Sequence, residues 1–263
     1  MLHIARVYSI SKFDFGDGMN KITGLIRRCA EDYDMIADGD VVAVGVSGGK
    51  DSIALLCALA SLRRYYPKRF ELIAVTLDMG LEGMDFTPVR RLCEELEVPY
   101  SLRATDIGRI IFEERRESNP CSLCAKMRRG ALNDAILGLG AGKLALAHHY
   151  DDAIETFLLS LIFEGRVNCF QPVTFLDRTG VTQIRPMLYV GERTIISFIK
   201  DNNLPVVENV CPANGATKRE EVKTLLRELS KTYPDLRSKI FGAMQRLPLE
   251  GWGTHERKRR PLP

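Results

Sequence analysis

The chain has 263 residues, and its 37 lysines and arginines nearly balance its 34 aspartates and glutamates, which leaves a formal net charge of +3. With 45% apolar and 27% charged residues, the composition excludes intrinsic disorder as the main state and suits one large domain, or one domain with a small appendage. The longest apolar runs fall far short of the ~20 residues that span a bilayer, so we expect no membrane protein. The N-terminus shows no signal-peptide pattern, and an odd number of cysteines, seven, favours a reducing compartment. The cytoplasm is the expected location.

Short apolar runs alternate with longer helical patterns from about residue 40 onward, which predicts an α/β fold with a doubly wound parallel sheet. The predicted strands are 41–46, 71–77, 100–104 and 143–147, and 183–187 is predicted as an edge strand. The predicted helices are 19–36, 52–65, 87–96, 121–139, 151–163, 192–201, 218–232 and 235–246.

Four parts follow from this pattern. We expect an N-terminal arm at 1–18, a nucleotide-binding α/β domain at 19–165, a helical part at 166–247 that completes the sheet, and a flexible basic tail at 248–263.

The segment from Ser47 to Ser52, Ser-Gly-Gly-Lys-Asp-Ser, stands between a predicted strand and a predicted helix. Gly48 and Gly49 let the backbone turn and point N–H groups at an anion, and the start of the helix adds its positive dipole end. Lys50 and the hydroxyls of Ser47 and Ser52 complete a phosphate cradle. A Walker A loop is excluded, because Val44 and Asp51 stand where it needs a glycine and a hydroxyl residue.

This six-residue loop resembles the PP-loop of the ATP pyrophosphatase superfamily, whose members cleave ATP between the α and β phosphates and leave an adenylated intermediate. Asp51 is then the natural ligand for a magnesium ion on the pyrophosphate, because hard oxygen donors suit that ion. The alternative is a plain Gly-Gly turn capped by Ser and Asp.

Residues that follow the second and fourth predicted strands should share this pocket, because ligands bind beyond the carboxyl ends of strands in such sheets. Leu77, Asp78 and Met79 would present backbone and a thioether to adenine. The segment 148–152, His-His-Tyr-Asp-Asp, would bring an imidazole and two carboxylates near the phosphates. His148 and His149 could instead be packing and capping residues, with Asp151 as a helix N-cap, although the pattern over 148–156 resembles that of PP-loop enzymes that modify tRNA.

Cys121 and Cys124 form a Cys-x-x-Cys pair at a predicted helix start, which suits half of a zinc site, a redox dithiol or part of an iron-sulfur ligand set. Zinc could take Cys211 and Cys169 as well, and the redox interpretation is weakened because the phosphate loop occupies the place of a thioredoxin-type dithiol. Cys211 lies in a predicted loop and could reach a cluster. The helical cysteines 29, 57 and 93 are expected to be buried, and Cys169 is ambiguous.

Together these segments, with Ile184-Arg-Pro186, resemble the tRNA 2-thiocytidine synthetase family over residues 20–247. The resemblance implies that Cys121, Cys124 and Cys211 hold a [4Fe-4S] cluster with one open iron. It implies that ATP activates C2 of an anticodon-loop cytidine, cytidine 32, and that sulfur replaces oxygen there. One departure is that some members carry a Cys-x-x-Cys at the third ligand position, where this chain has Cys211 alone.

Site roles follow from the resemblance and from the chemistry of the residues. ATP would bind at 47–52, at 77–79 and at His148, with magnesium on Asp51 and Asp152, and Asp51, Arg128 and Asp151 would be catalytic. Arg128 and Arg129 would lie beside the cluster and ATP and steady a target nucleotide or developing charge. Transfer RNA would contact Arg128, Arg129, Arg185 and the tail residues Arg257, Lys258, Arg259 and Arg260.

Partners would be tRNA, a sulfur donor such as a cysteine desulfurase, and a second copy in a homodimer. Three alternatives remain open: a 2-thiouridine synthetase of the same superfamily, lysidine formation on tRNA, and a zinc-containing ATP-binding regulatory protein. The first is disfavoured because the chain lacks terminal zinc-ribbon cysteines, and the second because its chemistry needs no cysteine triad.

Overall fold

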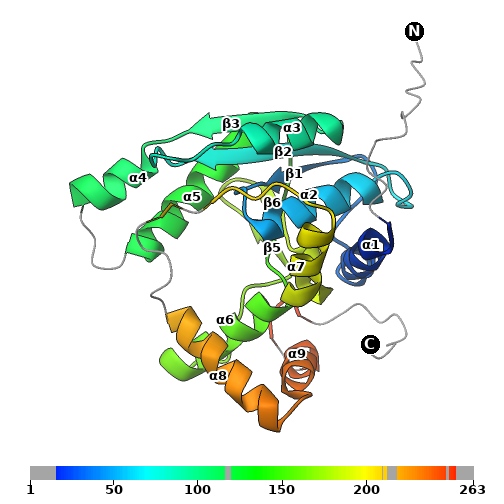
Figure 1. Ribbon diagram of the computed structural model, residues 1–263, viewed down its shortest axis with the longest axis vertical. Coiled ribbons are helices and arrows are strands. Elements are labelled where there is room, and N and C mark those ends of the chain that lie inside the picture. Colours follow the sequence, from blue (N-terminus) through cyan, green and yellow to red (C-terminus); the bar gives the residue numbers. More distant parts are fainter. Residues whose placement is uncertain (1–15, 116–119, 209, 212–217, 247–248, 253–263) are drawn as a thin grey trace.

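A computed structural model describes residues 16–115, 120–208, 210–211, 218–246 and 249–252. At its centre is a six-stranded sheet with the strand order β3-β2-β1-β4-β6-β5 (Figure 1). Five strands run parallel, and β5 is antiparallel to β6. The strands are β1 Asp40–Gly45, β2 Phe70–Asp78, β3 Tyr100–Ala104, β4 Lys143–Ala145, β5 Val173–Leu176 and β6 Val181–Ile184.

Alternate residues of the central strand β1 enter two different hydrophobic clusters, because successive side chains of a strand point to opposite faces. Val42 and Val44 belong to the larger cluster, whereas Ala43 belongs to the smaller one. The sheet is therefore buried on both faces, which confirms the doubly wound α/β fold.

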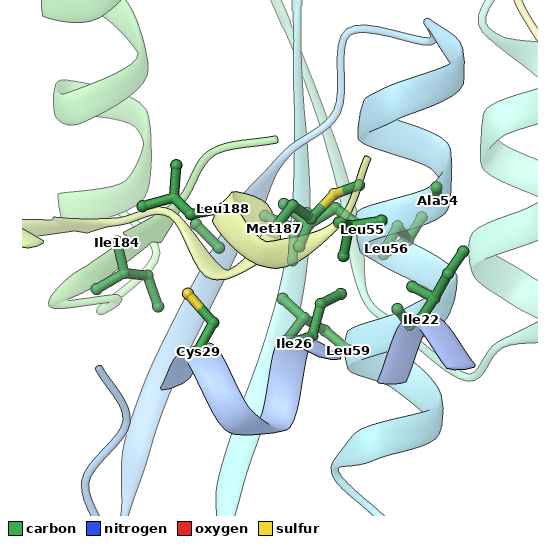
Figure 2. Close-up of a cluster of buried hydrophobic side chains, with 14 of the residues drawn as sticks. Ile22, Ile26, Cys29, Ala54, Leu55, Leu56, Leu59, Ile184, Met187 and Leu188 are labelled. Carbon is green, nitrogen blue, oxygen red and sulfur yellow. The ribbon is translucent and has the colours of Figure 1, made fainter. Parts of the chain in front are cut away.

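Helices α1 (Gly16–Asp32), α2 (Lys50–Leu62), α3 (Thr87–Glu95) and α7 (Glu192–Asp201) contribute to the larger cluster. Figure 2 shows Ile22, Ile26 and Cys29 of α1 packed near Leu55 and Leu59 of α2 and near Met187 and Leu188. All of these side chains are fully buried. The packing fixes α2, and hence the loop that precedes it, against the sheet.

Helix α5 (Pro120–Leu137) covers the other face through Ala135 and Ile136, which pack with Ala43, Val75 and Leu144. The last turns of α5 make this contact. Its first turns therefore extend past the buried part of the sheet, toward the carboxyl ends of the strands, where the site described below is found.

Helices α6 (Tyr150–Phe163), α8 (Lys218–Thr232) and α9 (Leu236–Arg246) gather below the sheet (Figure 1). Tyr150 of α6 stacks on Phe241 of α9 with ring centroids 4.6 Å apart, and Phe241 meets Trp252 at 5.5 Å. Short helical segments lie at α4 (Ile107–Arg109), at the π-helix η1 (Ile110–Arg115) and at the 3₁₀ helix η2 (Pro186–Tyr189). None of the described helices has the length and apolar character needed to cross a membrane.

The prediction of an edge strand at 183–187 is wrong both in its residue bounds and in its place in the sheet. Strand β6 ends at Ile184 and lies inside the sheet, between β4 and β5, while the edge is the short strand β5 that the sequence analysis did not predict. Pro186 cannot donate to a strand ladder, and it begins the 3₁₀ helix η2 instead.

Helix α1 ends at Asp32, four residues before its predicted end at Ile36. Asp34 adopts a left-handed conformation with φ of 46°, and the N–H of Met35 donates to the carbonyl oxygen of Ala30 at 2.9 Å, which closes the helix end. Met35 and Ile36 are buried nonetheless, which explains why the apolar pattern continues past the end of the helix.

The predicted flexible tail at 248–263 begins too early. Trp252 is fully buried, and its indole N–H donates to the carbonyl oxygen of Phe170 at 2.9 Å. Residues 249–252 are thus anchored to the core, whereas 253–263 and the predicted arm up to residue 15 lie outside the described residues.

Candidate active site

A pocket of about 530 Å³ opens at the carboxyl ends of β2, β1, β4 and β6. Its floor includes the strand residues Gly45, Val75 and Leu144 and also Leu146, just after β4. Its roof is the middle of α5, between Ala125 and Leu132. A Cβ on Gly45 would lie 3.3 Å from Leu132 of α5, so this glycine keeps the space between sheet and helix open. The predicted site residues that line the pocket are Ser47, Gly49, Asp51, Ser52, Leu77, Met79, Arg128, Arg129, His148 and Arg185.

The phosphate loop follows β1 directly, as predicted, and Gly48 makes its turn possible. Gly48 has a φ of +86°, and a Cβ there would lie 2.8 Å from Cβ of Val207. Gly49 has an ordinary φ of −71° and caps α2 without any side-chain hydrogen bond. Of the two glycines, Gly48 is the one whose backbone conformation requires glycine.

Two serines hold the loop in shape. The backbone N–H of Ser47 donates to Oγ of Ser52 at 3.2 Å, and that hydroxyl donates to the carbonyl oxygen of Gly49 at 2.9 Å. Ser52 is 4% exposed and lies in the first turn of α2. The positive end of the α2 dipole therefore faces the pocket, in the arrangement that binds phosphate elsewhere.

Lys50 is turned toward carboxylates. Its ammonium contacts both oxygens of Asp51 at 3.0 Å and Glu192 at 3.3 Å, and Glu192 also pairs with Lys223 of α8 at 3.0 Å. Burial works to lower the pKa of Lys50, but the hydrogen bond and charge of Asp51, with those of Glu192, raise it above its ordinary value. Glu192 was missed in the sequence analysis, because nothing in its local pattern reveals a partner so distant in the chain.

His149 is the N-cap of α6, and its ring nitrogen accepts from the N–H of Asp152 while Asp152 accepts from the N–H of His149. The capping interpretation is thus correct for His149, but Asp151 is not the N-cap. Asp152 also faces Arg219 of α8 at 3.5 Å and does not line the pocket. Its Oδ2 lies 3.4 Å from the Nε2 atom of His149, which is also 3.8 Å from Oδ1 of Asp51, so its role as a magnesium ligand stays a prediction. Of the two predicted magnesium ligands, Asp51 and Asp152, only Asp51 lines the pocket.

Asp151 does not line the pocket. One oxygen pairs with Arg237 of α9 at 2.6 Å, and the other accepts from the N–H of Glu192 at 2.8 Å, at the start of α7. It therefore ties α6 to α7 and α9. The catalytic role expected for it stays a prediction. Asp78, which was predicted to bind ATP, likewise accepts from the N–H of Gly80 at 2.9 Å and is not part of the pocket wall.

Arg185 was predicted to bind tRNA, but only 6% of it is exposed. Its guanidinium donates to the carbonyl oxygen of Gln171 at 2.6 Å and to the hydroxyl of Thr174 at 3.1 Å. Arg185 therefore lies in the pocket wall and not on the outer surface, and its contact with tRNA stays a prediction. Gln183, two residues earlier on β6, is 4% exposed. It also lines the pocket and was not predicted.

His148 packs on Phe170 with ring centroids 4.8 Å apart. Burial and the nearby charges of Arg185 and Arg219 lower its pKa to about 3, so the imidazole is neutral at physiological pH. Its Nδ1 atom is buried without a hydrogen-bond partner among the described residues.

The three cysteines predicted as ligands gather at the N-terminal end of α5. Cys121 is exposed, whereas Cys124 and Cys211 are half-buried. Burial raises the pKa of Cys124, the charges of Cys211 and Cys121 raise it further, and Arg128 opposes them, so the three thiols and this arginine share one neighbourhood. Cys124 Sγ also lies 3.9 Å from Sδ of Met79 in the pocket.

Within the described ranges, no three His, Cys, Asp or Glu side chains are close enough together to hold a single metal ion. The structure therefore does not support the zinc arrangement of Cys121, Cys124, Cys211 and Cys169. Cys169 is buried, donates to the carbonyl oxygen of Ala153 at 3.5 Å, and has a pKa raised by burial to about 12. A [4Fe-4S] cluster binds each thiolate to a different iron, so its ligands stand further apart than those of one ion, and three thiols in one neighbourhood fit that donor set.

The other cysteines, Cys29, Cys57 and Cys93, are fully buried, as predicted. The basic residues Arg257, Lys258, Arg259 and Arg260 lie outside the described part of the chain.

Comparison with known proteins places the chain in a family. The PP-loop domain family matches residues 22–229. The chain is 41% identical over 227 residues to the tRNA-cytidine(32) 2-sulfurtransferase of Geobacter sulfurreducens, which covers 85% of this chain and 88% of that protein. It is 42% identical over 222 residues to the protein of the same name from Pelobacter propionicus, with 83% and 82% covered.

Among solved structures, the U34-tRNA thiolase NcsA from Methanococcus maripaludis with its [4Fe-4S] cluster is similar in fold, with a TM-score of 0.71 at 23% identity, over 87% of this chain and 78% of that one. Its overall fold agrees with the α/β fold described above. The chain therefore belongs to the PP-loop family and, within it, to the family of enzymes named tRNA-cytidine(32) 2-sulfurtransferase.

Proposed function

We propose that the protein is a tRNA thiolase that uses ATP to replace the C2 oxygen of cytidine 32 with sulfur. The observation that carries this proposal is that one pocket is lined both by the phosphate loop and by the middle of α5. Cys124, just before that part of α5, contacts Met79 in the pocket wall. An activating nucleotide and a sulfur-handling group would thus act on one base.

The phosphate loop would hold the β and γ phosphates of ATP through Ser47, Gly49 and the N-terminus of α2. Adenine would lie against Leu77 and Met79. A magnesium ion would be held by Asp51 together with phosphate oxygens, because the carboxylate lines the pocket and hard oxygen donors suit this ion.

In the first step the O2 atom of cytosine would attack the α-phosphorus, form an O–P bond and release pyrophosphate. In the second step a sulfur nucleophile would attack C2, the C2–O2 bond would break, and AMP would leave with the oxygen. Arg128, exposed at the pocket roof, is placed to stabilise the negative charge that develops on the base and phosphate.

Cys121, Cys124 and Cys211 would hold the [4Fe-4S] cluster. Three thiolates would leave part of the cluster without a protein ligand, and the cluster would then supply a binding site for sulfide. The sulfur would come from a donor such as a cysteine desulfurase, and Arg128, Arg129 and the basic tail would contact the tRNA. A homodimer and a cytoplasmic location also belong to this proposal.

The test is thiolation of unmodified tRNA by protein whose cluster has been reconstituted without oxygen, with ATP, magnesium and sulfide. Nucleoside mass spectrometry should find 2-thiocytidine, and a tRNA with uridine at position 32 should stay unmodified. Appearance of 2-thiouridine in place of 2-thiocytidine would support the alternative 2-thiouridine synthetase. Zinc in place of iron in the purified protein, with no thiolation, would contradict both.

A further inference from the structure

We infer that Gln183 selects cytosine as the target base, by donating a hydrogen bond from its side-chain amide to N3 of the cytosine ring. This inference rests on the proposed function and deepens it, because the proposed reaction has to distinguish cytidine 32 from uridine. The subsite lies at the end of the pocket that β4 and β6 form, on the opposite side of β1 from the place proposed for adenine at β2.

The place of Gln183 in the sheet separates it from the nucleotide. Its partner in the parallel ladder is Leu144 of β4, and β4 lies between β6 and β1, the strand that leads into the phosphate loop. ATP, held by that loop and by Leu77 and Met79 beyond β2, would leave the β4–β6 end of the pocket to a second substrate. Gln183 lines this end, although only 4% of the residue is exposed.

Arg185 orients the Gln183 amide. Its guanidinium donates to the carbonyl oxygen of Gln171 at 2.6 Å and to the hydroxyl of Thr174 at 3.1 Å, and its Nη2 donates to Oε1 of Gln183 at 3.4 Å. Burial lowers the pKa of Arg185 to about 10, so the guanidinium stays protonated at neutral pH and acts only as a donor. The oxygen of the amide is therefore engaged. Its nitrogen donates to no described residue and is the atom that Gln183 offers to a ligand in the pocket.

The walls beside Gln183 are apolar and suit a flat ring. A Cβ on Gly45 would lie 3.3 Å from Leu132, 3.5 Å from Leu146 and 3.7 Å from Leu144, so these leucines surround the glycine. Glycine at this position leaves a space between β1, β4 and α5 that any side chain would narrow. Apolar walls with few, well-placed polar groups are typical of pockets that recognise a ring. A base from a single-stranded loop costs less to unstack into such a space than a base from a duplex.

The other polar groups at this end of the pocket carry no negative charge. Burial, with the charges of Arg185 and Arg219, lowers the pKa of His148 to about 3, so its ring is neutral at physiological pH. The carboxylates that line the pocket, Asp51 and Glu208, belong to the phosphate loop and to the segment after Val207. A neutral base is therefore read here by matching hydrogen-bond donors with acceptors.

A donor on Gln183 distinguishes cytosine from uracil at one atom. N3 of cytosine accepts a hydrogen bond, whereas N3 of uracil carries a proton, and two donors do not pair. O2 accepts in both bases, but in the proposed reaction O2 attacks the α-phosphorus and has to stay free. N3, next to the reacting C2 atom, is therefore the acceptor that the amide reads. Uracil would leave a buried donor unpaired, which is the strongest means by which a pocket rejects a close analogue.

The experiment measures binding of anticodon stem-loop RNAs to the full-length, cluster-loaded protein, in the presence of an ATP analogue with a methylene group between the α and β phosphates. The RNAs carry cytidine, 3-deazacytidine or uridine at position 32, and 3-deazacytidine differs from cytidine only in a C–H group in place of N3. The wild type should bind the cytidine RNA about five- to tenfold more tightly than either of the others, because one hydrogen bond to a buried donor contributes on that order. Fluorescence anisotropy gives the three affinities.

Two variants assign this preference to Gln183. Gln183→Leu keeps the approximate size of the side chain and removes the amide, so all three RNAs should bind with the affinity of the uridine RNA, and ATP affinity should not change. Gln183→Glu presents a carboxylate oxygen, which accepts a hydrogen bond, and should favour the uridine RNA over the cytidine RNA. Thr182→Val, next to Gln183 on the opposite face of β6, is the matched control and should keep the wild-type preference.

Thermal melting accompanies the titrations, because Arg185 loses one hydrogen-bond acceptor in Gln183→Leu. If this variant does not fold, Gln183→Glu and the wild-type comparison of cytidine with 3-deazacytidine carry the test. Equal affinity of the wild type for these two RNAs overturns the inference, and so does a cytidine preference that survives in either variant. A loss of ATP affinity in Gln183→Leu that equals its loss of RNA affinity also overturns it, since Gln183 would then belong to the nucleotide site.

Thiolation by the same wild-type preparation separates this inference from the proposed function. A wild type that forms 2-thiocytidine but binds the 3-deazacytidine RNA as tightly as the cytidine RNA contradicts the role of Gln183 alone. A wild type that prefers the cytidine RNA but never forms 2-thiocytidine contradicts the function alone.

Discussion

The backbone N–H of Val207 donates a hydrogen bond of 3.0 Å to the carbonyl oxygen of Gly48, so a segment near the end of the fold braces the phosphate loop. A Cβ on Gly48 would meet the side chain of this same valine at 2.8 Å. The segment continues through Glu208 at the pocket rim toward Cys211. The loop that would hold ATP is therefore in direct contact with the non-helical segment that leads to Cys211.

We predict that Gly48→Ala lowers both stability and ATP binding, whereas Gly49→Val lowers ATP binding alone. Alanine at Gly48 would combine a positive φ with the Val207 clash, at a cost of about 2–4 kcal/mol in the free energy of unfolding. Gly49 has an ordinary φ, and its nearest obstacle is Ser47 Oγ at 3.6 Å, so valine there obstructs the approach of phosphate. Urea unfolding and ATP titration of both variants decide, and an equally destabilised Gly49→Val would contradict the distinction.

We predict that Glu192→Gln tightens ATP binding about two- to fivefold, which corresponds to the loss of one partly exposed ion pair. Glu192 pairs with Lys50 at 3.3 Å and thus competes with phosphate for the ammonium. Glu221→Gln, which removes the partner of Lys218 on an exposed face of α8, is the matched control and should leave ATP affinity unchanged. Weaker ATP binding in Glu192→Gln would show that Glu192 orients Lys50 for phosphate and does not compete with it.

We predict that Cys121→Ala, Cys124→Ala and Cys211→Ala each lose iron and thiolation together while they keep ATP binding. Three thiolates are the whole ligand set of an open cluster, so none can be spared. Cys169→Ala should keep iron, because this thiol is buried against Ala153 and has a raised pKa. Iron and acid-labile sulfide assays check the set, and loss of iron in Cys169→Ala would mean a closed four-ligand site.

We predict that His148 makes the protein less stable as the pH falls below about 6.5. The pKa of His148 is about 3 in the folded chain against 6.5 ordinarily, so between these values the unfolded chain binds a proton that the folded chain does not. From pH 7 to pH 5 the loss should be roughly 1–2 kcal/mol in the free energy of unfolding, and His148→Asn should remove it. Denaturant unfolding at both pH values measures the difference, and identical pH dependence in the two proteins would contradict the shift.

We predict that deletion of 255–263 weakens tRNA binding and its salt dependence without an effect on ATP, because basic residues there would contact phosphates only. A deletion that also removes Trp252 should instead destabilise the fold by about 3–5 kcal/mol, since this side chain is fully buried. Filter binding at several salt concentrations and thermal melting separate the two effects. Unchanged tRNA affinity in the shorter deletion would show that the tail has no part in binding.

The local sequence determined the features that depend on neighbouring residues. The strand before Ser47, the Gly-Gly turn and the helix after it follow from short-range sterics and apolar spacing, and the matching helices at 192–201 and 218–232 follow from the same kind of pattern. The predicted ends of α1 and β6 were wrong. Asp34, in a left-handed conformation, ends α1, and Pro186 ends the extended segment of β6, although the apolar residues that follow each of them stay buried.

Only the tertiary structure decided what the charged residues of the site do. Asp51, Asp151 and Asp152 look equally suited to metal or acid–base chemistry in the sequence, yet Arg237 and Arg219 of the distant helices α9 and α8 engage the latter two and leave Asp51 to the pocket. Arg185 reads as a nucleic-acid contact until its burial is seen, and the local pattern gives no sign that Trp252 is buried. The role of a carboxylate or guanidinium depends on the charged or polar group that it contacts. In this fold that group comes from a distant part of the chain, and separation in sequence does not predict separation in space.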